Sequence, residues 1–234
     1  KKQDTIWKEK NVLAVQDKKE IIAIGEDAYQ MYEKTPPDIE VAFPMRDGVI
    51  SRFNDMQNLL QNILKKNRHF SRGAEYVIAV PTDVTEVQKK AFFDLVIHSN
   101  AKAREVNIVE RSIADAVGLG IDVQNTTGVM IINFGGETTE LSVLTEGGIV
   151  FNRLLKLGGT TLDQEIVNLV RNSHDFLIGS RTAEILRQQF DVFNGDSETA
   201  FSVAGRDLIT GLPMRKTISI TLVRAALKIL FWNV

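Results

Sequence analysis

Residues 129–143 read VMIINFGGETTELSV, an apolar run followed by two glycines, two threonines and a second, alternating run. We expect two strands joined by a tight turn at Gly135 and Gly136. Glycine lets a backbone approach an anion without interference from a Cβ atom, and neighbouring N–H groups can converge on phosphate oxygens. The hydroxyls of Thr138 and Thr139 add hydrogen-bond donors. The stretch predicts a phosphate-binding β-hairpin, with an ordinary glycine turn as the alternative.

The composition excludes several classes of function. The net charge of −2 argues against nucleic-acid binding, and the absence of cysteine excludes disulfides, thiolate zinc sites and cysteine nucleophiles. The three histidines are too scattered for a histidine-rich metal site. No apolar run has the length of a transmembrane helix, and the first residues do not form a signal peptide. We therefore expect a cytoplasmic protein with one large domain or two small ones.

The first half alternates strand and helix patterns. Residues 12–16 and 20–25 predict a hairpin, and Pro36-Pro37 breaks the chain after a short helical stretch. Apolar residues at helical spacing predict a helix around residues 56–64. A strand at 76–80, a helix opened by a capping box over 83–86, a strand at 106–109 and a helix at 113–117 follow. This order implies a mixed or parallel sheet with crossover helices.

The second half repeats that organisation after a boundary near residues 122–127. The phosphate hairpin is followed by a third strand at 149–156 and by helices at 162–170 and 180–189. Two further strands are expected near 201–203 and 217–220. The repetition suggests a duplicated α/β fold around a central cleft.

Several sequence blocks together carry a family resemblance. They are PMRDGVI at 44–50, REV at 104–106, GG at 135–136 with TTE at 138–140, IG at 178–179 with RTAE at 181–184, and GRD at 205–207 with TGLP at 210–213. In this order the chain resembles the bacterial actin homologues of the MreB family over almost its full length. The resemblance implies an α/β, actin-like ATPase fold, in which ribonuclease H-like duplicated domains enclose a nucleotide cleft. It places actin-like domain I at 1–124, with a small outer subdomain at about 13–46, and domain II at 125–234, with one at about 161–213.

The resemblance is incomplete at both ends. The family's N-terminal phosphate loop, DLGTANT, has no counterpart before Lys1, and its late GGG adenosine segment has none before Val234. We therefore expect the N-terminal and C-terminal parts of the fold to be missing from these residues.

Inside the site, the chain departs from the family in three places. Asn133 stands where the family has the aspartate that holds magnesium through water, and Glu137 replaces a third glycine. Glu110, Arg111 and Ser112 match two glutamates and a proline, so Arg111 takes the place of the glutamate that orients the attacking water. A guanidinium cannot accept a proton. We expect ATP or ADP, poorly held magnesium and at most weak ATPase activity; the alternative is that Glu110 or Glu137 substitutes as the acid.

The same resemblance assigns the remaining site residues. Gly135, Gly136, Thr138 and Thr139 would contact phosphates. Glu184 and Arg187 would lie near the ribose and base; the alternative is an ordinary surface pair at helical spacing. Phe70, among the cations of KKNRHFSR at 65–72, would touch the membrane, with a solvated loop as the alternative. Filament contacts are expected near 194–198 and 36–37.

The leading functional prediction is a filament-forming cytoskeletal protein in cell-shape determination. Its expected partners are further copies of itself, the inner membrane surface and the cell-wall synthesis machinery, with a cytoplasmic location that is peripheral at the inner face of the membrane. One alternative is an active ATPase of the same superfamily, such as a sugar kinase or heat-shock chaperone. A second is a pseudo-enzyme scaffold that does not polymerise.

Overall fold

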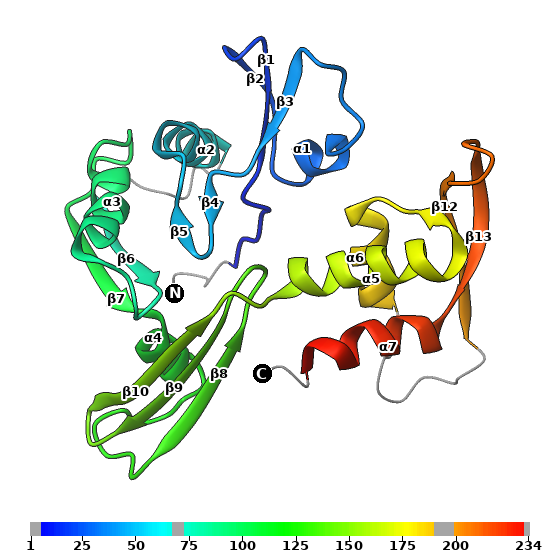
Figure 1. Cartoon of the computed structure of the whole chain (residues 1–234). Helices are drawn as coiled ribbons and strands as arrows, with labels where there is room; N and C mark the ends of the chain where they lie inside the picture. The colour runs from blue at the N-terminus through cyan, green and yellow to red at the C-terminus, as the bar shows by residue number, and fades with distance from the viewer. Residues whose placement is uncertain (1–5, 67–72, 190–198, 232–234) are drawn as a thin grey trace. The chain divides into compact units, whose positions relative to one another are not determined.

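The computed structural model describes residues 6–66, 73–189 and 199–231 (Figure 1). Contacts divide the chain into two compact units. The segment that contains the glycine hairpin belongs to the second unit, although the residues on both sides of it belong to the first. The first unit comprises Lys1–Asn133 and Glu140–Leu154, and the second comprises Phe134–Thr139 and Leu155–Val234. The predicted boundary at residue 124 concerns actin-like domains rather than contact units, and it stays a prediction.

The first unit begins with a small antiparallel sheet of order β2-β1-β3. Strands β1 (Leu13–Gln16) and β2 (Glu20–Ile24) form the predicted hairpin. Its turn places Asp17 and Lys18 at φ values of 49° and 57°, in the left-handed region. The third strand, β3 (Ile39–Ala42), pairs with the other edge of β1 and was not predicted. Helix α1 (Glu26–Met31) lies between β2 and β3 in sequence.

Helix α2 (Phe53–Lys66) supplies the apolar face that covers this sheet. Leu59 from α2 packs with Leu13, Ile24 and Ala42 in one buried cluster, so the predicted amphipathic helix is confirmed. Between the sheet and α2, the PMRDGVI block forms a two-stranded hairpin of β4 (Met45–Arg46) and β5 (Val49–Ile50).

A parallel strand pair continues the unit and confirms the predicted crossover. Strands β6 (Glu75–Val80) and β7 (Glu105–Glu110) pair in parallel, and α3 (Glu86–Ile97) connects them. The capping-box prediction was wrong in its residues: Thr85 caps α3, and its partner is Gln88 rather than Glu86. The predicted box over 83–86 has the same spacing of three residues, but in the structure the N-cap lies two residues later, at Thr85. Helix α4 (Arg111–Gly118) follows β7 directly.

The glycine hairpin lies in a three-stranded sheet of order β10-β9-β8. Its strands are β8 (Val129–Phe134), β9 (Thr139–Thr145) and β10 (Gly148–Leu155), so the three predicted strands are confirmed. Ala116 from α4 packs against Ile131 and Leu144, so the helix that follows β7 is fixed to this sheet by apolar burial.

The second unit packs three helices against a small antiparallel sheet (Figure 1). Helix α5 (Gly159–His174) leads through β11 (Phe176–Leu177) to α6 (Ser180–Gln189), which has the predicted bounds. Strands β12 (Ala200–Asp207) and β13 (Pro213–Ser219) form a hairpin, with β11 on the other edge of β12. The predicted last strand was wrong at Ile220, which begins α7 (Ile220–Phe231). Ile220, Val223 and Leu227 of that helix are buried in the core, so their spacing is helical.

Candidate functional site: a glycine hairpin and a charge-exchanged position

The glycine hairpin closes through a hydrogen bond that requires glycine. The N–H of Gly135 donates to the Thr138 carbonyl oxygen at 2.8 Å. A Cβ atom at position 135 would lie 2.8 Å from that same oxygen, closer than real Cβ contacts allow. The tightness of this turn therefore explains Gly135 without any ligand.

The hairpin is held against the start of α5 by its own carbonyl oxygens. Gly159 N–H donates to the Gly135 carbonyl at 3.0 Å, and Thr160 N–H donates to the Gly136 carbonyl at 2.7 Å. The Thr160 hydroxyl reaches the same Gly136 oxygen at 2.8 Å. A Cβ atom on Gly158 would lie 2.7 Å from the backbone of Gly136 and Glu137. These contacts satisfy two of the N–H groups that a helix leaves unpaired at its start, and they fix the position of the turn.

Gly136 is the open point of the turn. A Cβ atom there would meet no heavy atom within 4 Å, and within the described residues its N–H has no acceptor. The two threonines differ from this: both are buried, and the Thr139 hydroxyl donates its hydrogen to the Leu157 carbonyl at 2.7 Å. In this structure that hydrogen is therefore not available to a phosphate.

Arg187, which was predicted to lie near the ribose and base, is held by a side chain near the start of α5. Its Nε donates to Asp163 Oδ1 at 2.7 Å and its Nη2 donates to Oδ2 at 3.2 Å, a bidentate pair between α6 and α5. Nη2 also lies beside Gly159, because a Cβ atom there would be 3.1 Å away. Glu184, one turn earlier on α6, accepts a hydrogen bond from Gln188 at 3.1 Å. The second unit thus brings the hairpin and Arg187 to one place.

Arg111, in the first unit, faces a buried carboxylate. It begins α4, and its Nη1 lies 3.9 Å from Glu140 Oε2. The other oxygen, Oε1, accepts the Thr82 N–H at 2.8 Å, and the Thr82 hydroxyl lies 3.1 Å from that of Ser112. The position that resembles the family's water-orienting glutamate is therefore occupied by a cation with its own counter-charge.

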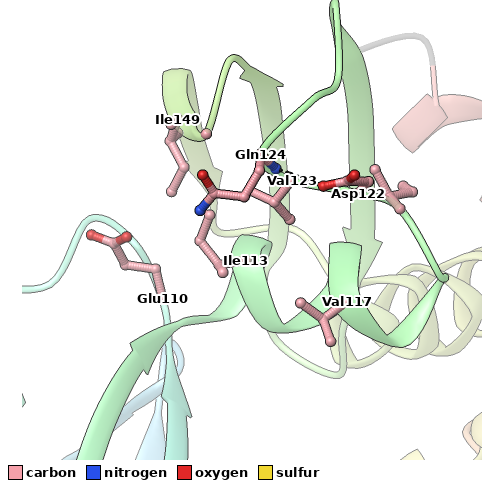
Figure 2. A pocket seen from close by; sticks show the side chains of 10 residues that line it. Glu110, Ile113, Val117, Asp122, Val123, Gln124 and Ile149 are labelled. Carbon is pink, nitrogen blue, oxygen red and sulfur yellow. Dashed lines mark hydrogen bonds between the residues drawn. The ribbon is translucent and has the colours of Figure 1, made fainter.

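Two further predicted residues have different surroundings. Glu110, at the end of β7, lines a hollow beside α4 together with Ile113 and Ile149 (Figure 2). The Asn133 amide donates to Asp115 Oδ2 at 2.6 Å, so the residue predicted to stand at the magnesium-site position is hydrogen-bonded to a carboxylate on α4. In the part of the chain that the structure describes, no three His, Asp or Glu side chains gather as a metal-binding group.

Asp115, Glu140 and Asp163 were missed by reasoning from the sequence. Asp163 could have been found, since it lies within the apolar stripe of α5 beside Leu162, Ile166 and Val167. A charged residue in an apolar stripe indicates a buried pair. Glu140 was considered only as part of the TTE block at 138–140. Its place in an apolar strand also indicates a buried charge that needs a partner.

Phe70 and residues 194–198 lie outside the described residues. No helix in the described part of the chain is both long and apolar enough to cross a membrane. The membrane and filament contacts predicted from these segments stay predictions.

Comparison with known proteins agrees with the geometry. The family model described as "MreB/Mbl protein" matches residues 1–234. The chain is 34% identical over 228 residues to the cell shape-determining protein MreB of Escherichia coli K12, covering 94% of this chain and 65% of that protein. It is 32% identical over 212 residues to Mbl of Bacillus subtilis 168, covering 89% of this chain and 63% of that protein. The chain thus spans somewhat less than two thirds of the length of these curated relatives.

Solved structures show the same fold. MreB5 of Spiroplasma citri bound to AMPPNP matches with a TM-score of 0.89 and 31% identity, over 96% of this chain and 68% of that one. The MamK double helical filament matches with a TM-score of 0.73 at 20% identity, over 96% of this chain and 70% of that one, which supports the fold alone. The predicted actin-like fold is therefore confirmed. The chain belongs to the MreB/Mbl family.

Proposed function

We propose that this chain is the nucleotide-binding part of an MreB-like, filament-forming cell-shape protein in which ATP hydrolysis is weak or lost. The observation that carries the proposal is the glycine hairpin. Its turn is fixed on α5 by the carbonyls of Gly135 and Gly136, while the N–H and the Cβ direction of Gly136 remain open. A rigid turn with an outward N–H suits a phosphate oxygen.

Relatives support the nucleotide part of the proposal. The Spiroplasma citri MreB5 structures were determined with AMPPNP and with ADP. In this chain Gly136 and Thr138 would contact the phosphates, and Gly135 would shape the turn. Thr139 would contribute its oxygen rather than a hydrogen, because its hydroxyl already donates to Leu157. Arg187 and Glu184 would lie near the sugar and base, with Asp163 holding the guanidinium in one orientation.

Weak hydrolysis follows from the residues at the family's catalytic position. A group that positions or deprotonates the attacking water typically contributes ~10²–10⁴ in rate. Arg111 cannot do so, because its guanidinium has no acceptor and stays charged. Asn133 lacks the negative charge expected to hold magnesium, and its amide is already bonded to Asp115. Glu110 is the nearest remaining acid in sequence, and it would have to supply any residual activity.

The nucleotide proposal is tested by the affinity of AMPPNP for Gly136→Asp, measured by calorimetry. The variant should keep the wild-type melting temperature because its Cβ points into open space. It should nevertheless lose at least tenfold in affinity, because its carboxylate would repel a phosphate. Gly148→Asp is the matched control, since a Cβ there also meets nothing within 4 Å. Equal AMPPNP affinity in wild type and Gly136→Asp would refute the phosphate assignment.

The hydrolysis proposal is tested by phosphate release per subunit. Wild type should show little release above buffer, and Glu110→Gln should change it little. Robust wild-type turnover that Glu110→Gln abolishes would show that Glu110 is a working catalytic acid, and the proposal of crippled hydrolysis would then be wrong.

Polymerisation and membrane contact complete the proposal. A head-to-tail contact between copies propagates without closure and makes a filament. Lys65 and Lys66 end α2 just before the segment that contains Phe70, and cations near anionic lipid contribute about 1 kcal/mol each. Electron microscopy on anionic lipid with AMPPNP should show filaments. Liposome co-sedimentation should fall for Phe70→Ser, and equal binding would refute the membrane contact.

A further inference from the structure

A hollow in the first unit lies outside the residues proposed for nucleotide binding, except for Glu110. It has a volume of about 550 Å³ and is bounded by α4, by residues 121–124 and by the start of β10. In Figure 2 the α4 side chain Ile113 lies toward Val123 and Gln124, with Glu110 on one side and Asp122 on the other. Val117 of α4 also lines the hollow. Ile121, Val123 and Ile149 complete an apolar lining.

The hollow continues along β10. A second hollow of about 410 Å³ shares Glu110 and Ile149 with the first and extends to Asp83, Val150 and Phe151. Val150 and Phe151 are 63% and 50% exposed, so this part of β10 presents apolar side chains to an incoming ligand. We call the two hollows together the β10 groove.

The charged side chains that line the β10 groove are all acidic. Its lining includes three acids, Asp83, Glu110 and Asp122, and no lysine or arginine. Within the described residues, no hydrogen bond or ion pair engages the carboxylates of Asp83 and Glu110. The Asn125 amide donates to Asp122 and lowers the pKa of its carboxyl.

Strand β10, which borders the groove, is an edge strand of its sheet. In the described sheet of order β10-β9-β8, β10 pairs on one side only. An edge strand presents unpaired backbone groups to which another extended chain can add, with alternate side chains reaching pockets beside it.

We propose that the β10 groove docks an extended segment of a partner protein in which apolar and basic residues alternate. Apolar side chains would fill the space over Ile113, Val117 and Ile149, while basic side chains would pair with Asp122, Glu110 and Asp83. The backbone of the segment would bond to the β10 edge. The apolar lining favours a polypeptide over a free metal cation, and the acidic rim disfavours nucleotides and anionic lipid by charge repulsion. This inference does not depend on the proposed nucleotide function.

The test uses the whole chain and an acetylated, amidated eight-residue peptide of alternating valine and lysine. Calorimetry should show saturable one-to-one binding that weakens as salt rises, and no binding of the valine–glutamate counterpart. Asp122→Asn should weaken binding about fivefold, as expected for one exposed ion pair. Val117→Ser should weaken it about tenfold, since burying a valine is worth roughly 1.5 kcal/mol. Val117 is 66% exposed, so its replacement should leave the fold intact.

Matched controls separate docking from general charge or hydrophobicity. Asp27→Asn removes an exposed acid on α1, and Val87→Ser removes a 79% exposed helical valine; neither residue lines the β10 groove. Both controls should bind the peptide as wild type does. Three results would each overturn the proposal: no binding, equal losses in controls and groove variants, or self-association of the chain that Val117→Ser abolishes, which would make a second copy the occupant.

Discussion

The guanidinium of Arg111 lies 3.9 Å from the carboxylate of Glu140, whose side chain is only 2% exposed. Glu140 Oε2 has no hydrogen-bond donor among the described residues, so Arg111 is the main compensation for its charge. A buried charge without a counter-charge is strongly unfavourable. Arg111 thus compensates the charge of Glu140 in the fold, apart from the effect that we propose for it on ATP hydrolysis.

This pairing predicts a stability cost on removing the cation. Arg111→Met should lower the free energy of unfolding by about 2–3 kcal/mol, because Glu140 would be left charged and buried. Adding Glu140→Gln should recover most of that loss. Urea denaturation measures both effects, and Lys89→Met, whose partner Glu86 is 88% exposed, should cost less than about 1 kcal/mol. A double variant no more stable than Arg111→Met would contradict the assignment.

The contact between hairpin and helix predicts a difference between two glycines. Gly158→Ala should destabilise the protein by about 1–3 kcal/mol, since its Cβ would collide with the hairpin backbone. Gly136→Ala should have almost no effect on stability, because its Cβ meets open space. Thermal melts of the two variants check this, and equal melting temperatures would show that the hairpin moves away from α5 easily.

Protonation of Asp207 should lower the stability of the fold at acid pH. The Thr210 N–H, followed by Lys216 and the Thr210 hydroxyl, holds the pKa of Asp207 down to about 2, from an ordinary 3.8. A depressed pKa gives stability that is present above pH 3.8 and is lost as pH falls toward 2. Asp207→Asn should therefore reduce the dependence of the unfolding midpoint on pH in this window. An unchanged pH dependence in Asp207→Asn would contradict this assignment.

Removing the hydroxyl of Tyr76 should not lower the stability of the protein. Its hydroxyl is buried and has no hydrogen-bond partner among the described residues, and burial raises the pKa of the phenol. Removing an unsatisfied buried group should be neutral or stabilising by up to about 1 kcal/mol. Tyr76→Phe should thus melt at or above the wild-type temperature. A clear fall in melting temperature would mean that the hydroxyl has a partner, such as a bound water.

Periodicity was enough to predict most of the fold. The apolar run at 129–134 and the alternating run that follows the glycines predicted β8 and β9, and the helical spacing of apolar residues predicted α2. Short strands such as β3 and β11 carry too few residues to show a period. Ile220 was assigned to a strand because TISI alternates, although the residues that follow repeat at helical spacing.

The candidate site was predictable only in part. Glycines and threonines mark the hairpin from sequence alone, because their chemistry is local. Pairs such as Arg187 with Asp163 and Arg111 with Glu140 join residues far apart in the chain, and they depend on packing that a single sequence does not show. Thr139 illustrates the same limit: its hydroxyl was expected to face a phosphate but donates to Leu157.

The 2.6 Å hydrogen bond from Asn133 to Asp115 also constrains how this chain can evolve. If Asn133 alone became aspartate, two carboxylates would meet at hydrogen-bond distance with no hydrogen to share unless one took up a proton. An acid at position 133 would therefore require that Asp115 be protonated, move away or be replaced. Residues 115 and 133 thus act as a coupled pair, so the effect of a substitution at one of them depends on the residue at the other.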